Sequence, residues 1–206
     1  MGRLPVDLTD IDTKVTRLFA LVSEALAGAT LALLGGEYAT GRAIVDGDLA
    51  IDELTNEIDR ETWQYIESGD VTPDELRRLV AVLLIVPELE RSADLAEHIA
   101  QRAVKHLGGE MSPMSRGIVQ RMSDVALEMW RTAADAYGDH SSQGVLLDEA
   151  DEEIDMLRDR LTEEVASGAM PAPTGAQVTL LARFYERLGD HAVNLARRIE
   201  MLHPRS

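Results

Sequence analysis

Four pairs of acidic residues with the same internal spacing stand out in this chain. In each pair the two acids are four residues apart, and the pairs are Asp48 and Asp52, Glu90 and Asp94, Asp151 and Asp155, and Glu186 and Asp190. Residues four apart lie on one face of a helix, one turn from each other. Each pair would therefore aim two carboxylates in the same direction, if the chain is helical there.

Carboxylates held close together repel one another unless a cation lies between them or their pKa values rise. Carboxylate oxygens are the preferred ligands of hard divalent and trivalent cations. The four pairs therefore predict metal binding, with Fe, Zn, Mn or Mg as candidate ions. A second interpretation stays open, in which the acids form an ordinary solvated face and pair with Arg91 and Arg187.

The apolar pattern between these acids is helical throughout. Six segments repeat their apolar residues at helical spacing, and none alternates as a strand does. Helix starts are predicted by a capping box at Thr72 to Glu75, by Ser112-Pro113 and by a second capping box at Thr174 to Gln177. The expected fold is all-α, with helices over residues 9–38, 44–67, 73–107, 113–137, 145–166 and 175–202.

The six segments form two matching triplets. A shift of 96 residues carries Glu90 onto Glu186, and a shift of 103 residues carries Asp48 onto Asp151. The chain therefore looks like a duplicated three-helix unit, with repeats at residues 1–108 and 109–206. We predict two tandem antiparallel three-helix bundles related by an internal pseudo-two-fold axis. If the acidic flanks of neighbouring helices meet, each repeat presents four carboxylates along one seam.

Composition limits the class of protein. The formal net charge of −17 repels nucleic-acid phosphates, so we expect no direct binding to nucleic acid. The chain has no cysteine, which excludes disulfides and thiolate metal sites. The longest fully apolar run, Leu79 to Pro87, is too short to span a bilayer, and the N-terminus lacks a signal-peptide pattern. We expect a cytoplasmic protein without a membrane span.

Catalysis has little support in the sequence. A carboxylate-bundle enzyme of the di-iron type needs Glu-x-x-His on two helices, and Glu200 with His203 is the only such pair. No glycine-rich phosphate loop and no nucleophile with a matching base is present. We therefore predict a binding protein with no catalytic residues, and keep a metal-dependent carboxylate-bundle enzyme as the alternative.

The stretches "DELRRLVAVLLIVPELERSADLAEHIA" and "RFYERLGDHAVNLARRI", preceded by "GDLAID" and "ADEEID", resemble the PhoU family along nearly the whole chain. The second copy keeps the family pattern around Glu186 and Asp190. In the first copy Ser92, Ala93 and Leu95 replace the usual Ile, Gly and His. The resemblance therefore suggests that the second site binds metal more tightly than the first.

The same resemblance implies a cytoplasmic, often dimeric regulator of phosphate uptake and of the phosphate-starvation response. Its expected partners are a subunit of a phosphate ABC transporter, the associated sensor histidine kinase, or both. Some members bind multinuclear metal clusters at the acid pairs, which would assign all eight acids named above to two metal sites. The family also includes domains that accompany other ion transporters, so a different transport system is a second possibility.

Small and apolar residues of the first helix predict self-association. The run "ALAGATLALLGG", residues 25–36, would let another helix approach closely. We predict a homodimer that uses this strip. In the alternative interpretation, these residues fill the core of the bundle.

Overall fold

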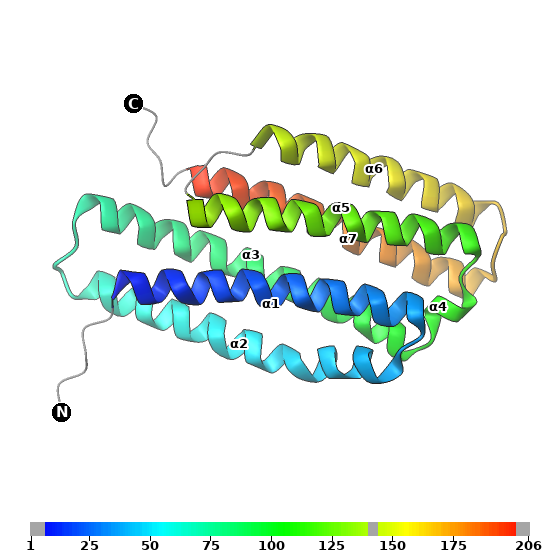
Figure 1. Ribbon diagram of the computed structural model, residues 1–206, viewed down its shortest axis with the longest axis horizontal. Helices are drawn as coiled ribbons and strands as arrows, with labels where there is room; N and C mark the ends of the chain where they lie inside the picture. The colour runs from blue at the N-terminus through cyan, green and yellow to red at the C-terminus, as the bar shows by residue number, and fades with distance from the viewer. Residues whose placement is uncertain (1–6, 140–143, 201–206) are drawn as a thin grey trace.

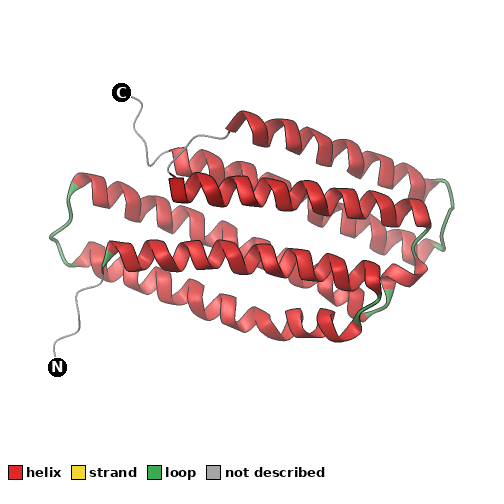
Figure 2. Ribbon diagram, in the orientation of Figure 1, coloured by secondary structure: helices red, strands yellow, loops and turns green. Residues whose placement is uncertain are grey.

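The computed structural model of the protein describes residues 7–139 and 144–200, and these residues form helices and short connections without a strand (Figure 2). The helices are α1 (Leu8–Gly35), α2 (Tyr38–Glu67), α3 (Pro73–Val104), α4 (Leu107–Glu110), α5 (Pro113–Asp139), α6 (Gly144–Ala166) and α7 (Ala172–Glu200). The predicted all-α class is confirmed. Six of the helices correspond to the six predicted segments, and α4 is an additional short helix.

The six long helices pack as two triplets. Helices α1, α2 and α3 contact one another, and so do α5, α6 and α7 (Figure 1). The triplets meet through α1 against α5 and α3 against α7. Each of these pairs joins equivalent helices of the two predicted repeats, as an internal two-fold arrangement requires. Helices α2 and α6 are left on the outside of the bundle. The predicted boundary between residues 108 and 109 falls inside α4, and the division into two domains stays a prediction.

One apolar core runs through both triplets. Its largest fully buried side chains include Phe19 of α1, Trp130 of α5 and Tyr185 of α7. The Tyr185 hydroxyl lies 2.6 Å from the hydroxyl of Thr30, which also accepts a hydrogen bond from Ser123 at 2.9 Å. These hydroxyls come from α7, α1 and α5, so a satisfied polar contact fixes how the triplets sit against each other.

Helix α1 lies in the middle of this core. Among the described helices it alone is long and apolar enough to cross a membrane, judged by length and composition. A buried core helix meets the same criterion, and Ile11, Val15, Leu18 and Leu26 are all fully buried here. The strip predicted to form a dimer is buried on one side, because Ala29, Thr30, Ala32 and Leu33 belong to the core, whereas Leu31 is 59% exposed. The buried side of the strip agrees with the alternative interpretation, in which these residues fill the core, and the homodimer itself stays a prediction.

The helix boundaries depart from prediction mainly where glycines were taken as breaks. Helix α2 begins at Tyr38 rather than at residue 44 and runs through Gly41 and Gly47. In the connection between α1 and α2 it is Gly36 that adopts a left-handed backbone, with φ of 72°. Gly41 is helical for a packing reason: a Cβ there would lie 3.3 Å from the Ala100 carbonyl oxygen of α3. Glycine therefore lets α2 approach α3 closely.

The capping predictions were right twice and wrong once. Thr72 forms the predicted capping box with Glu75, and the Ser112 hydroxyl accepts from the Ser115 amide at the start of α5. Helix α7, however, begins at Ala172, two residues before Thr174. The Thr174 hydroxyl instead donates to Glu110 at 2.7 Å and so ties α7 to α4.

The contact between α4 and α1 can be tested by substitution of two neighbouring glycines. A Cβ on Gly108 would lie 1.8 Å from the Leu33 carbonyl oxygen, whereas a Cβ on Gly109 would meet nothing within 4 Å. Because the clash is with the backbone of α1, which cannot move aside easily, we expect Gly108→Ala to lower the free energy of unfolding by about 1–3 kcal/mol. The matched control Gly109→Ala should change it by less than about 0.5 kcal/mol. Urea denaturation followed by circular dichroism measures both, and equal stabilities would contradict this packing.

Candidate functional site

The fold brings the predicted acids together helix by helix. Helix α2 carries Asp48 and Asp52, and its neighbour α3 carries Glu90 and Asp94. We call these four residues the first seam. Helices α6 and α7 repeat the arrangement with the second seam, which consists of Asp151, Asp155, Glu186 and Asp190.

The carboxylates of the first seam influence one another strongly. Burial, followed by the charges of Asp52, Glu97, Asp94 and Glu90, raises the pKa of Asp48 from its ordinary value of 3.8 to about 6. Burial and neighbouring carboxylates also raise the pKa values of Glu90 and Asp94. The side chains of α2 and α3 therefore share one strongly negative region.

No basic side chain forms an ion pair with these carboxylates within the part of the chain that the structure describes, and Arg91 and His98 only partly offset the raised pKa values of Glu90 and Asp94. None of the four carboxylates lies within ion-pair distance of a lysine, arginine or histidine there. Arg91, a predicted partner, pairs instead with Glu88 at 2.9 Å. Glu88 belongs to α3 and faces α7, where its carboxylate also forms an ion pair with Arg198 at 2.7 Å. An ordinary salt-bridged face therefore does not describe the first seam.

Two further acids extend the first seam beyond the predicted pairs. Asp59 follows Asp52 by two helical turns on α2, and Glu97 follows Glu90 by two turns on α3. Asp59 contributes to the raised pKa of Glu90, and Glu97 to that of Asp48. Neither acid belongs to a pair spaced by four residues, the only spacing used for the prediction, but a spacing of seven also keeps residues on one helix face.

Two buried oxygen atoms on the same face of α2 have no hydrogen-bond partner among the described residues. They are Oγ1 of Thr55 and Oδ1 of Asp59. Thr55 is only 5% exposed and lies three residues after Asp52. Buried oxygens are nearly always satisfied by a protein group, water or an ion. The first seam therefore offers oxygen donors without a competing cation.

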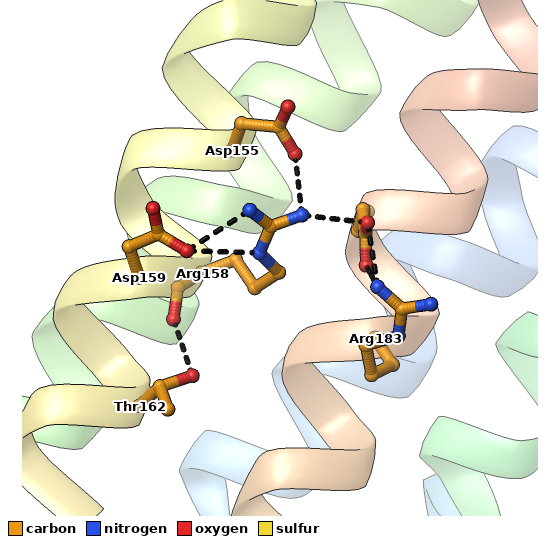
Figure 3. A network of polar contacts seen from close by, with 6 residues as sticks. Asp155, Arg158, Asp159, Thr162 and Arg183 are labelled. Carbon is orange, nitrogen blue, oxygen red and sulfur yellow. Dashed lines mark hydrogen bonds and ion pairs between the residues drawn. The ribbon is translucent and has the colours of Figure 1, made fainter.

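The second seam is different because it contains an arginine. Arg158 of α6 places Nη1 2.8 Å from Oδ1 of Asp155 and 2.7 Å from Oε1 of Glu186 on α7 (Figure 3). Its Nη2 donates to Asp159 at 2.9 Å. Arg183 of α7 also pairs with Glu186, at 2.7 Å. Two of the four carboxylates in this seam are thus already neutralised by guanidinium groups.

The other two acids of the second seam remain without an ion pair in the described part of the chain. Burial, then Asp190 and Asp155, raises the pKa of Asp151 to about 6, and burial raises that of Asp190. Gly189 lets α6 approach here, since a Cβ at this position would lie 2.9 Å from Oδ1 of Asp151. The first repeat has Ala93 at the equivalent place.

The histidines lie close to different groups, and His98 is one turn after Asp94 on α3, where it partly offsets the rise in the Asp94 pKa that burial and Asp52 cause. The Nδ1 atom of His191 is 2.8 Å from the Ser92 hydroxyl, in the contact between α3 and α7. His98 stacks on Phe184, with ring centroids 5.4 Å apart. His203, the partner of Glu200 in the Glu-x-x-His pair, lies outside the described residues.

The two seams differ in their fit to a metal ion. In neither seam, as far as the described residues go, do three ligating side chains already converge on one point. The first seam nevertheless has the right donors for a hard cation, with unsatisfied oxygens and no basic group to displace. The second seam does not fit in the same way, because Arg158 already fills the space between Asp155 and Glu186.

Comparison with known proteins identifies the chain's relatives. The sequence profile of the PhoU domain matches it twice, over residues 15–103 and 119–199. The chain belongs to the PhoU family. The two matches fall on the two helix triplets, so the PhoU domain is present once in each.

Two relatives carry the name phosphate-specific transport system accessory protein PhoU homolog. The protein of Caulobacter vibrioides (strain NA1000 / CB15N) is 29% identical over 203 residues, which cover 96% of this chain and 86% of the relative. That of Zymomonas mobilis is 30% identical over 195 residues, covering 92% and 82%. The crystal structure of PhoU from Pseudomonas aeruginosa superposes with a TM-score of 0.87 at 22% identity, covering 95% of this chain and 96% of that one. That similarity confirms the PhoU fold.

The repulsion in the first seam of this PhoU protein predicts a pH-dependent stability. A carboxyl group whose pKa is raised on folding stabilises the protein below its unfolded pKa, and this stability is lost as the pH rises through about 6 for Asp48. In the presence of a chelator, Asp48→Asn should therefore raise the melting temperature at pH 7.5. Because Asp48 is partly exposed we expect about 1 kcal/mol, or ~2–4 °C.

This gain should shrink as the pH falls from 7.5 towards 4, where the native carboxyl group of Asp48 is itself protonated. Asp46→Asn is the matched control, because Asp46 lies on the same helix, is exposed and pairs with Arg42. It should bring no gain at either pH. A gain for Asp48→Asn that is independent of pH would mean that charge repulsion does not act in the first seam.

Proposed function

We propose that this protein is a non-catalytic regulator of phosphate uptake and of phosphate-starvation signalling. The observation that carries the proposal is the double match to the PhoU domain over both helix triplets. The names of its relatives, accessory proteins of phosphate-specific transport systems, support a role beside a transporter rather than in catalysis. A regulator of a different ion transporter is the second candidate, since the family resemblance extends to such domains.

We propose that it acts in the cytoplasm by binding a subunit of a phosphate ABC transporter, its sensor histidine kinase, or both. The protein offers two outer helices, α2 and α6, whose exposed sides are free of contacts with the other triplet. A homodimer also stays a prediction, although one side of the strip in α1 that motivated it lies in the core. Light scattering at tens of micromolar measures the oligomeric state.

We further propose that a hard cation, Fe, Zn, Mn or Mg, binds to the first seam. Asp48, Asp52, Glu90 and Asp94 would supply the oxygen ligands, with Asp59 and Glu97 nearby. The raised pKa values of Asp48, Glu90 and Asp94 support this, because a cation relieves the same repulsion that a proton does. When bound, such an ion would supply a positive charge that attracts carboxylates of both α2 and α3 and so holds the two helices together. Those two helices would then present a fixed outer surface to a partner.

Deletion of the gene in its native host tests the regulatory role. In phosphate-rich medium we expect the deletion strain to take up phosphate faster and to express more phosphatase than the parent, because the restraint is removed. The wild-type gene should restore repression. The double variant Asp52→Asn/Asp94→Asn should restore less than the control variant Asp46→Asn if the cation is needed for signalling.

A pull-down with the tagged full-length protein, from cells grown at high and low phosphate, identifies the partner. Recovery of a phosphate-transporter subunit or its sensor kinase, with a yield that depends on phosphate, is the expected result. Unchanged uptake and phosphatase expression in the deletion strain, together with recovery of another transport system, would favour the second candidate function.

A further inference from the structure

The two seams have equivalent acids but different neighbours. The shift of 103 residues that aligns Asp52 with Asp155 places Thr55 opposite Arg158. The shift of 96 residues that aligns Glu90 with Glu186 places Pro87 opposite Arg183. Both arginines that bind carboxylates in the second seam are thus replaced in the first by residues without a charge.

Arg158 holds a position that joins two helices. Its side chain is 25% exposed, and that of Glu186 is 15% exposed. One nitrogen, Nη1, donates to Asp155 of α6 and to Glu186 of α7, while the other end of the guanidinium donates to Asp159 (Figure 3). A cation between α6 and α7 would take the same two carboxylates as ligands. Arg158 therefore performs the bridging that a metal ion would perform.

The first seam has no such bridge. Thr55 is too short to reach across to α3 as an arginine does, and its buried Oγ1 has no hydrogen-bond partner among the described residues. The four carboxylates of the first seam also have no ion pair in the described part of the chain. The charge that Arg158 and Arg183 supply in one repeat is missing in the other.

We propose that Arg158 is the built-in cation of the second seam and takes the place of a metal ion there, so that cation binding is confined to the first seam. This inference rests on the cation proposed above for the first seam. It reverses the order expected from the sequence motif, which is more complete around Glu186 and Asp190. A guanidinium stays protonated at every physiological pH and cannot become a ligand.

A metal ion could enter the second seam only by displacing Arg158 from Asp155 and Glu186. The displaced guanidinium would remain beside the ion, because Asp159 and the stem of the side chain hold it there, and the two positive charges would repel. Asp151 and Asp190 alone leave two carboxylates, half the set that the first seam offers, so an ion there would have to keep most of its water ligands and would be held more weakly. The second seam would therefore bind no metal ion at ordinary metal concentrations, and only the occupancy of the first seam would change with the metal concentration.

Exchange of the two equivalent residues tests this. The full-length protein is stripped with a chelator, dialysed against MnCl2, and its bound manganese is measured by elemental analysis, with circular dichroism as a check of folding. Arg158→Thr should bind about twice as much manganese as the wild type, because a second set of four carboxylates becomes available. Adding Asp190→Asn to it should remove that gain. Thr55→Arg should bind almost none.

Two control variants and one matched pair of variants separate the effect of charge from a general disturbance of the fold. Arg158→Lys keeps the positive charge and should bind as much manganese as the wild type. Arg160→Thr removes an exposed arginine two residues away on α6 and should also change nothing. In the wild type, Asp94→Asn should reduce the bound manganese strongly, whereas the equivalent Asp190→Asn should leave it unchanged.

Two results would overturn the inference while leaving the cation proposal intact. One is a loss of manganese from the wild type on Asp190→Asn as large as that on Asp94→Asn. The other is a folded Arg158→Thr protein that binds no more manganese than the wild type. Absence of manganese from the wild type and from every folded variant would instead overturn the cation proposal itself, together with this inference.

Discussion

The packing of α1 on α5 and of α3 on α7 is the constraint on which the rest of the structure depends. It buries Phe19, Trp130 and Tyr185 in one core and satisfies the Tyr185 hydroxyl through Thr30 and Ser123. Four of the six long helices contribute apolar side chains to this contact as well as to the packing within their own triplet. Helices α2 and α6 are left at the two outer sides, each covered on one face only. The acids on the flanks of these outer helices consequently meet acids of α3 and α7 at the rim of the core, where burial is partial and water is near.

The partial burial explains why the seams are electrostatically sensitive without being unstable. A fully buried group of four carboxylates could not ionise, because desolvation alone would keep it protonated. A fully exposed group would be screened by water and salt. At the rim, burial and neighbouring charges together raise the pKa of Asp48 and of Asp151 to about 6. When such carboxylates are ionised near neutral pH, their desolvation and mutual repulsion destabilise the folded protein. Binding of a cation or a proton relieves this destabilisation.

The sequence was sufficient to predict the fold class, the two helix triplets and the eight acids, because all of these depend on periodicity within one helix or on repetition along the chain. It failed where the answer depends on a contact between helices. Gly41 lies inside α2 and lets it approach α3, and Thr174 lies inside α7, where its hydroxyl donates to Glu110 of α4 instead of capping the helix. The strip in α1 was judged by its composition, whereas its burial is decided by helices distant in sequence. No pattern within a single segment contains that information.

The difference between the seams illustrates the same limit at the level of chemistry. Repeat alignment matches acids with acids, and by that measure the two seams are equivalent. What decides the chemistry is the residue one turn away, Arg158 in one repeat and Thr55 in the other. The positive charge of a guanidinium is part of the chain and is always present. A seam without an arginine obtains a positive charge only when an ion binds from solution. Duplication followed by this one exchange would give a protein in which one half is fixed and the other half can sense its surroundings. A sensor needs both parts, because a helix that responds to a ligand can transmit the change only by moving against a frame that does not respond.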